Sequence, residues 1–288
     1  MSLNDILLVC AALLPAIALC IYVFKKDRVE KEPIGLLLGL LLLGGLICFP
    51  AAEVEGGLID LLDSIFSPYM VEYEGKFYLF GTAYKLYNAC KYFIGVALVE
   101  EGFKFLVLFI FTRKNKNFNS LFDGLIYAVF VSLGFAALEN VFYVLEYGWI
   151  NALVRAVMSV PGHMFFAVLM GYYYSHWHMH EKARQLELNL QKVGLIKQKG
   201  LEFSGKRYLV LGLLIPVLAH GWYDYCCTIE TIIATISLYA FLIFLYIYCF
   251  KKIKSMSKGD MEDTVYSTIM LLEKYPHLIE KLKEIDVT

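Results

Sequence analysis

The sequence predicts an all-α polytopic transmembrane helix bundle with about seven spans. Of its 288 residues, 59% are hydrophobic and 18% are charged, whereas soluble domains average about 45–50% apolar and about 25% charged residues. The apolar residues gather in runs of roughly 20, the length at which a helix crosses about 30 Å of hydrocarbon. The net charge of −1 gives no indication of the basic surface that nucleic-acid-binding proteins need. We therefore expect the lipid bilayer, and no nucleic acid, as a partner.

The order of the spans follows from the apolar runs and from the basic residues between them. The predicted spans are residues 3–24, 34–52, 89–112, 121–146, 154–175, 208–226 and 229–250. The first has no Lys or Arg before it, so we expect a retained span rather than a signal peptide. Lys and Arg concentrate in the loops 25–33, 113–120 and 176–207 and at the start of the tail. This pattern predicts an N-terminus outside and a C-terminus in the cytoplasm.

The chain divides into a transmembrane domain and a short tail. We expect residues 1–254 to form the transmembrane domain, with a catalytic core at about 89–226, and residues 255–288 to form a cytoplasmic helical tail. The segments 57–66 and 180–196 have helical apolar spacing, which predicts helices on the outer and inner membrane surfaces. The seven cysteines show no zinc-type spacing, and we interpret them as packing residues.

Ionisable residues inside the spans are the main functional signal, because such groups are costly in a bilayer and usually mark sites. The polar residues of the spans are Glu100, Glu101, Lys104, Glu139, Asn140, His163, His220 and Asp224. By helix rise, the carboxylates and histidines lie roughly 9–16 Å below the outer end of their spans. Four helices thus bring polar groups to one depth, which predicts a shared site.

Local spacing supports that site. Glu100 and Lys104 are four residues apart, so they can pair on one helix face, while Glu101 is rotated by about 100°. One carboxylate can then be held ionised while the other serves as a general base for water. His220 and Asp224 are also four residues apart, and an aspartate can orient an imidazole. Pro161-Gly162, just before His163, predicts a break in the fifth span.

Two other polar features have structural interpretations. His176, His178 and His180 alternate at the cytoplasmic end of the fifth span, where we expect an interfacial aromatic cluster rather than a metal site. Asp123 is expected to be a helix-start residue, since acidic groups favour that end of a helix.

Four short motifs resemble the PrsW family of intramembrane proteases, distant relatives of the CAAX prenyl endopeptidases and abortive-infection membrane proteases. These motifs are EExxK at Glu100–Lys104, FxxxEN at Phe135–Asn140, the single His163, and HxxxD at His220–Asp224. They follow one another in order over roughly residues 90–226. One departure is Glu139, where the related prenyl endopeptidases have histidine.

The resemblance implies hydrolysis of a peptide bond in or beside the membrane. Family members are associated with the first cut of single-span anti-sigma factors in bacteria, so it implies such a substrate and a multi-pass protein of the bacterial cytoplasmic membrane. Glu100 or Glu101 would activate water, and His220, held by Asp224, would bind the oxyanion. Glu139 and His163 would position the water or the scissile carbonyl. Which glutamate takes the proton stays open.

Three alternatives accompany this hypothesis of a protease without a metal cofactor. A zinc protease would use Glu139, His163 and His220 as ligands and a glutamate of the pair as base, although the HExxH spacing is absent. A proton-coupled transporter would use the same groups as a proton relay, but the chain has no inverted repeat and no second interrupted span. A structural or scaffold role would need no chemistry from these groups.

Overall fold

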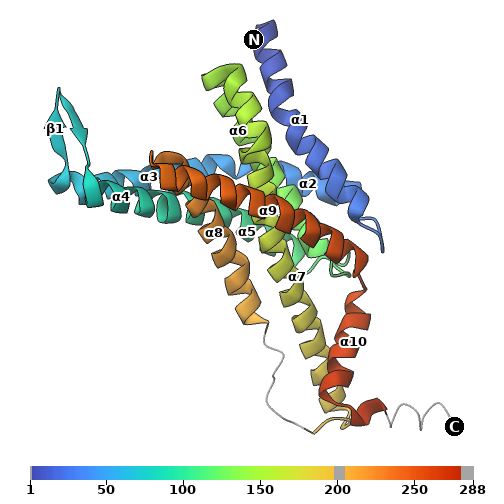
Figure 1. Ribbon diagram of the computed structural model, residues 1–288. Coiled ribbons are helices and arrows are strands. Elements are labelled where there is room, and N and C mark those ends of the chain that lie inside the picture. The colour runs from blue at the N-terminus through green and yellow to red at the C-terminus, as the bar shows by residue number, and fades with distance from the viewer. Residues whose placement is uncertain (1, 198–204, 280–288) are drawn as a thin grey trace, which may run out of the picture.

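The computed structural model describes residues 2–197 and 205–279, which form a bundle of helices with one small hairpin (Figure 1). The helices are α1 (Leu3–Lys26), α2 (Ile34–Leu46), α3 (Cys48–Phe66), α4 (Gly81–Cys90), α5 (Leu98–Thr112), α6 (Asp123–Val157), α7 (Ser159–Lys192), α8 (Lys206–Thr228), α9 (Ile232–Lys258) and α10 (Asp263–Lys274). A 3₁₀ turn, η1 (Ser67–Tyr69), follows α3, and a π-helical segment, η2 (Lys91–Ala97), joins α4 to α5.

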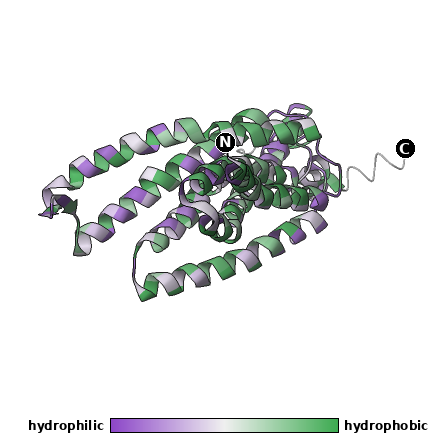
Figure 2. Ribbon diagram, turned by 90° about the horizontal axis from the view of Figure 1, so that it is seen from above, coloured by the Kyte–Doolittle hydropathy of each residue, from purple (hydrophilic) through white to green (hydrophobic). Residues whose placement is uncertain are grey.

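The expectation of an all-α membrane protein is confirmed in its coarse form. Within the described ranges, five helical segments are long and apolar enough to cross a membrane: Leu3–Lys26, Ile34–Tyr69, Asp123–Lys192, Lys206–Thr228 and Ile232–Lys258. Hydrophobic residues run along the helices at the edge of the molecule (Figure 2). The third segment, of 70 residues, contains both α6 and α7. The predicted span 89–112, which covers the end of α4, η2 and α5, is not among the five. Seven crossings and the orientation stay predictions.

A turn at Gly148 reverses the chain inside α6. Its φ of 76° lies in the left-handed region, which glycine adopts without steric cost. Val144 and Ala152, on either side of this turn, pack against Leu8 and Ala12 of α1. The predicted loop 147–153 is therefore only a turn, and the second limb of α6 leads directly into α7.

The break predicted at Pro161-Gly162 lies slightly upstream, at Met158, between α6 and α7. Pro161 falls in the first turn of α7, where a missing N–H is tolerated. The carbonyl of Val157 accepts a hydrogen bond from the Tyr246 hydroxyl of α9 instead. The polar group that proline leaves free is thus satisfied by a neighbouring helix.

Helix α6 is the centre of the bundle, and its first limb is buried on nearly all sides. Glycines allow α2 to cross it closely: a Cβ atom on Gly134 would lie 1.9 Å from the Leu41 carbonyl oxygen, and one on Gly44 would lie 2.0 Å from that of Val131. Small residues at such crossings let membrane helices approach to backbone contact. This packing fixes the helix that carries Glu139.

The segment between α2 and α5, which the sequence predicts on the outer side, differs in structure from the prediction. Its helix α3 runs without a break from Cys48 to Phe66, so the separate surface helix predicted at 57–66 is part of a longer helix. The strands β1 (Val71–Tyr73) and β2 (Lys76–Tyr78) form an antiparallel hairpin that the sequence analysis missed. Its turn uses Glu74 and Gly75, both with positive φ, a pattern typical of two-residue hairpin loops.

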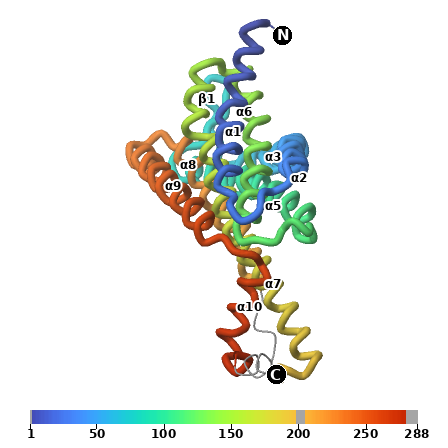
Figure 3. The backbone as a smooth tube through the Cα atoms, turned by 90° about the vertical axis from the view of Figure 1, so that its right-hand side faces the viewer, coloured from blue at the N-terminus to red at the C-terminus, as the bar shows by residue number. Residues whose placement is uncertain are grey.

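The inner segment 180–196 is also part of a longer helix, because α7 continues to Lys192. Helix α10 lies beside this extension (Figures 1 and 3). Ala183, Ile196, Leu271, Tyr275 and Leu278 form an apolar cluster between them. Buried Glu187 accepts hydrogen bonds from Lys274 and Tyr275. The tail is therefore docked on the helix that carries His163, although its residues 280–288 lie outside the described part.

Asp263 fixes the start of α10. Burial raises the pKa of this carboxyl, but His178 and Lys182, whose nitrogens lie 3.5 Å and 2.9 Å from its Oδ2, outweigh burial and lower it to about 2. A depressed pKa stabilises the docked tail above the ordinary carboxyl pKa of about 4, and this stabilisation is lost as the pH falls toward 2.

Asp263→Asn is expected to speed proteolytic cleavage or hydrogen exchange of α10 about 10-fold or more at pH 7, since it weakens these charge-assisted bonds. The exposed neighbour Glu262 provides the control variant Glu262→Gln, which should leave the protection of α10 unchanged. Equal protection of α10 in Asp263→Asn and wild type would contradict this role.

Candidate active site

The EExxK segment forms the floor of the site on α5. The Lys104 ammonium donates to Glu100 Oε2 at 2.9 Å and to Glu101 Oε1 at 2.8 Å. Glu101 and Lys104 are 0% exposed and Glu100 is 5% exposed. Lys104 Nζ also lies 4.2 Å from the centre of the Phe135 ring, a favourable cation–π position. One lysine therefore holds both buried carboxylates.

The π-helical segment η2 sets the direction of these side chains. Leu98 N–H bonds to the carbonyl of Phe93, five residues earlier, so one extra residue enters the helix just before Glu100. Without it, the following residues would be rotated by about 100°. Gly221 of α8 packs directly on this segment, since a Cβ atom there would lie 2.7 Å from the Phe93 ring.

His163 connects α5 to α6. Its Nδ1 lies 3.2 Å from Lys104 Nζ, and its Nε2 lies 3.0 Å from Glu139 Oε2. An ammonium can only donate, so Nδ1 accepts and we assign the ring proton to Nε2, which donates to Glu139. The Ser132 hydroxyl donates to the His163 carbonyl at 2.9 Å and fixes its backbone.

His220 of α8 connects α5 to Asp224, which lies four residues farther along α8. Its Nδ1 lies 3.0 Å from Glu101 Oε1, and its Nε2 lies 3.3 Å from Asp224 Oδ2. Both neighbours are carboxylates, which accept hydrogen bonds, so the geometry assigns a donor to each ring nitrogen. The ring stacks on Phe166, with centroids 4.9 Å apart. His220 is thus held as a donor in a fixed orientation.

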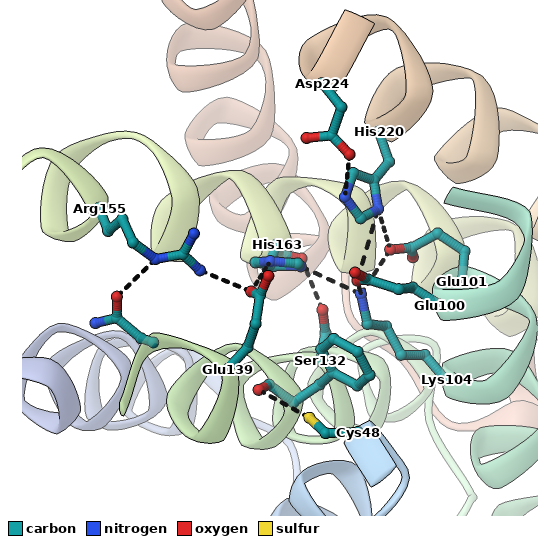
Figure 4. A network of polar contacts seen from close by, with 12 residues as sticks. Cys48, Glu100, Glu101, Lys104, Ser132, Glu139, Arg155, His163, His220 and Asp224 are labelled. Atoms are coloured by element: carbon teal, nitrogen blue, oxygen red, sulfur yellow. Dashed lines mark hydrogen bonds and ion pairs between the residues drawn. The ribbon is translucent and has the colours of Figure 1, made fainter. Parts of the chain in front are cut away.

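All five predicted catalytic residues meet in this network (Figure 4). A cavity of about 540 Å³ opens over it, and its lining includes Glu100, Glu139, His163, His220 and Asp224. Glu101 does not line the cavity but lies behind it, bonded to Lys104 and His220. The two glutamates of the pair therefore have different access to a substrate.

Two supporting residues have structural positions. Phe135 lies under the Lys104 ammonium, as described above, and its carbonyl accepts from the Cys48 thiol at 3.4 Å. Asn140 is fully buried and does not line the cavity. Its amide donates to the Ala12 carbonyl at 2.9 Å, so it links α6 to α1.

Arg155 is the main polar residue that the sequence analysis missed. It donates from Nη2 to Glu139 Oε2 at 2.7 Å and from Nε to Asn140 Oδ1 at 2.8 Å. It also lies 3.9 Å from the centre of the Tyr143 ring. The signal was present, because Arg155 is a basic residue inside the predicted span 154–175 and met the criterion used for the other ionisable groups.

Arg155→Gln is expected to lower the rate of substrate cleavage about 10–100-fold, mainly through kcat, because Glu139 loses the donor that orients it. Arg155→Lys should restore part of the rate, since it keeps the charge but not the two-pronged contact. Arg184→Gln, at a surface ion pair with Glu181 on the same helix as His163, is the control. A wild-type rate for Arg155→Gln would show that Glu139 does not need this contact.

The site offers four side-chain atoms that could act as ligands of a metal ion. Glu100, Glu101, His163 and His220 each offer one atom, and these atoms lie within 4.8 Å of one another. Imidazole and carboxylate are suitable zinc ligands, and Glu101 Oε2 is buried without a hydrogen-bond partner among the described residues. The set differs from the expected one, because Glu101 and Glu100 replace Glu139, which lies on the far side of His163. Lys104 Nζ already contacts three of these residues.

Comparison with known proteins assigns a family. The family model described as PrsW family intramembrane metalloprotease matches residues 32–250. The chain belongs to the PrsW family. The protein named Protease PrsW of Halalkalibacterium halodurans is 32% identical over 75% of this chain and 81% of its own length. That of Clostridioides difficile is 31% identical over 82% and 85%, and that of Shouchella clausii 28% over 87% and 97%. No solved structure gives a significant match.

Membership in the PrsW family makes this chain an intramembrane protease, with a protein substrate and a multi-pass membrane setting. The resemblance drawn from the four motifs is confirmed, and the protease assignment takes precedence over the transporter and scaffold alternatives. The match also covers α2, α3 and most of α9, beyond the motif region.

The HWHMH histidines lie far along α7, where His178 stacks on Phe118 at 3.7 Å.

Proposed function

We propose that this protease cuts a membrane-anchored substrate near the extracytoplasmic end of its span, and that Glu100 activates the water. The observation that carries the proposal is the cavity over the network, which exposes Glu100 but not Glu101. A general base must reach its water within about 2.6–3.2 Å, and only a residue that lines the cavity can do so. Single-span anti-sigma factors of a bacterial cytoplasmic membrane are the proposed substrates.

Each remaining residue has a role that follows from its contacts. Glu101 accepts from Lys104 and His220 and so keeps both donors in place. His163, whose Nε2 proton is held by Glu139, orients that carboxylate toward the cavity. His220 is held at Nδ1 by Glu101, and it lines the cavity beside Asp224. Its Nε2 proton, which Asp224 accepts at 3.3 Å, would be shared with the oxyanion that forms when water attacks the carbonyl carbon. The proton taken by Glu100 then passes to the leaving amine.

The proposed mechanism needs no metal, because the Lys104 ammonium already neutralises the donors that a cation would bind. A zinc form is the second candidate, favoured by the convergence of Glu100, Glu101, His163 and His220. Zinc bound there would polarise the scissile carbonyl and lower the pKa of a bound water. Purified protein is expected to keep its activity after chelation. A stoichiometric zinc ion that is lost together with activity would favour the second candidate.

A comparison of membrane proteomes tests the substrate class. Cells with the wild-type enzyme are expected to contain single-span proteins truncated on the extracytoplasmic side, which cells with Glu100→Gln/Glu101→Gln lack. Mass spectrometry of the new termini would place the cut relative to the span. Identical proteomes, or termini confined to cytoplasmic segments, would contradict the proposal.

A further inference from the structure

Helix α3 brings one more carboxylate to the cavity, and nothing in the catalytic network uses it. Cys48, Ala52, Glu55 and Ile59 all line the cavity, and their spacing of three and four residues places them on one helix face. Glu55 is half-buried. It shares the cavity with Glu100, Glu139 and Asp224, so four acidic side chains face the same space.

Glu55 differs from the other acidic residues of the lining in having no partner. Glu100 is paired with Lys104, Glu139 with Arg155, and Asp224 with His220. Across residues 2–197 and 205–279, the Glu55 carboxylate makes no hydrogen bond or ion pair. A substrate that fills the cavity would take the remaining water from this half-buried carboxylate, which is costly unless a partner replaces the water. Its position at a substrate cavity therefore points to a partner that arrives with the substrate.

Two basic side chains besides the histidines line the cavity, and Arg155 is already paired with Glu139. Lys91 also lines the cavity, but it belongs to η2, and its ammonium lies 5.5 Å from the centre of the Tyr92 ring without an ion pair to Glu55. Lys91 and Glu55 thus remain separate charges on two walls of the cavity. The experiment below includes Lys91 for this reason.

The distance of Glu55 from the catalytic groups can be expressed in substrate residues. Cys48, Ala51, Val99 and Phe135 belong to one packed cluster, so this part of α3 packs near the start of α5, just before Glu100. Glu55 is four residues beyond Ala51 along α3, about 6 Å by helix rise. An extended peptide covers that length in about two residues.

We propose that Glu55 is a specificity residue that binds a lysine or arginine side chain of the substrate about two residues from the scissile bond, on its extracytoplasmic side. This inference rests on the proposed function. Such a contact would be selective, because basic residues are scarce on the outer side of membrane spans. A substrate that carries one there is distinguished from most single-span proteins by a buried ion pair rather than by apolar shape.

Binding measured without cleavage tests the inference separately from catalysis. The probes are fluorescent single-span peptides with Lys, Gln or Glu at successive positions in the outer third of the span. They are bound to the full-length Glu100→Gln variant in nanodiscs. We expect one Lys position to bind about 10-fold more tightly than the Gln peptide. Adding Glu55→Gln should remove this difference, and Glu55→Arg should make the Glu peptide the tighter ligand.

Two further variants serve as controls. Glu53→Gln removes an exposed carboxylate of the same helix and should keep the Lys preference. Lys91→Gln should keep it as well, whereas a Lys preference that appears only in Lys91→Gln would assign Glu55 to Lys91 in the wild type and overturn the inference. Equal affinities for the Lys and Gln peptides would also overturn it. Cleavage of the same peptides by the wild type tests the proposed function independently, because a specific cut without Lys preference would uphold that function and reject the role of Glu55.

Discussion

Glu100→Gln is expected to lower the rate of substrate cleavage at least about 10³-fold. Glutamine keeps the shape of the side chain and can still contact Lys104, but it cannot take a proton from water, and general-base catalysis contributes about 10²–10⁴-fold. The loss should appear in kcat, since the proposed mechanism has Glu100 act on the water and not on the substrate side chains. The measurement is the initial rate of appearance of the cut product from a purified single-span substrate in nanodiscs.

The two glutamates give a matched comparison. Glu101→Gln should cost less, about 10–100-fold, because Glu101 lies behind the cavity and acts through Lys104 and His220. Exposed Glu53 on α3 supplies the control variant Glu53→Gln, for which we expect a wild-type rate. A larger loss in Glu101→Gln than in Glu100→Gln would exchange the proposed roles of the pair. Wild-type rates in both variants would reject a glutamate base.

The residues of the candidate site could be predicted because burial of charge leaves a clear pattern in the sequence. Glu100, His163 and His220 stand out in apolar runs, and the structure brings them together with Glu139 in one network. The same principle applies to Arg155, which was not included because it lies at the very start of the predicted span 154–175. Asp224 was predicted as the partner of His220 from their spacing, and it contacts the ring. The contacts of the histidines to other helices could not be predicted, because they depend on how α5, α7 and α8 rotate about their axes.

Helix ends were the least predictable part of the fold. Predicted spans end where hydropathy falls, whereas α3 and α7 continue as helices for several turns beyond that point. Hydropathy reports the solvent around a segment, and backbone hydrogen bonding does not need an apolar solvent. The π-helical segment before Glu100 has no residue pattern of its own, yet it decides which way the EExxK side chains face. Packing of Gly221 against Phe93 accompanies it, and that contact is distant in the chain.

Lys104→Met is expected to lower both activity and stability strongly. Lys104 is fully buried and donates to Glu100 and Glu101, so the variant leaves two carboxylates in the protein interior without their cation. Removal of one partner from a buried ion pair costs about 3–5 kcal/mol. The expected result is no detectable cleavage and a clearly lower midpoint of thermal unfolding in detergent. Wild-type stability would show that another group neutralises the pair.

Compensation separates the two effects and also tests the metal. Lys104→Met/Glu101→Gln removes one of the unpaired charges, so its unfolding midpoint should recover toward that of the wild type while cleavage stays absent, because Glu100 remains without its cation partner. Lys104→Met also clears the ammonium from the four donors grouped for zinc. If the enzyme works without metal, added zinc can raise the stability of this variant but not its activity. Zinc-dependent cleavage by Lys104→Met would instead mean that the EExxK glutamates bind a metal ion for catalysis, rather than pairing with the lysine.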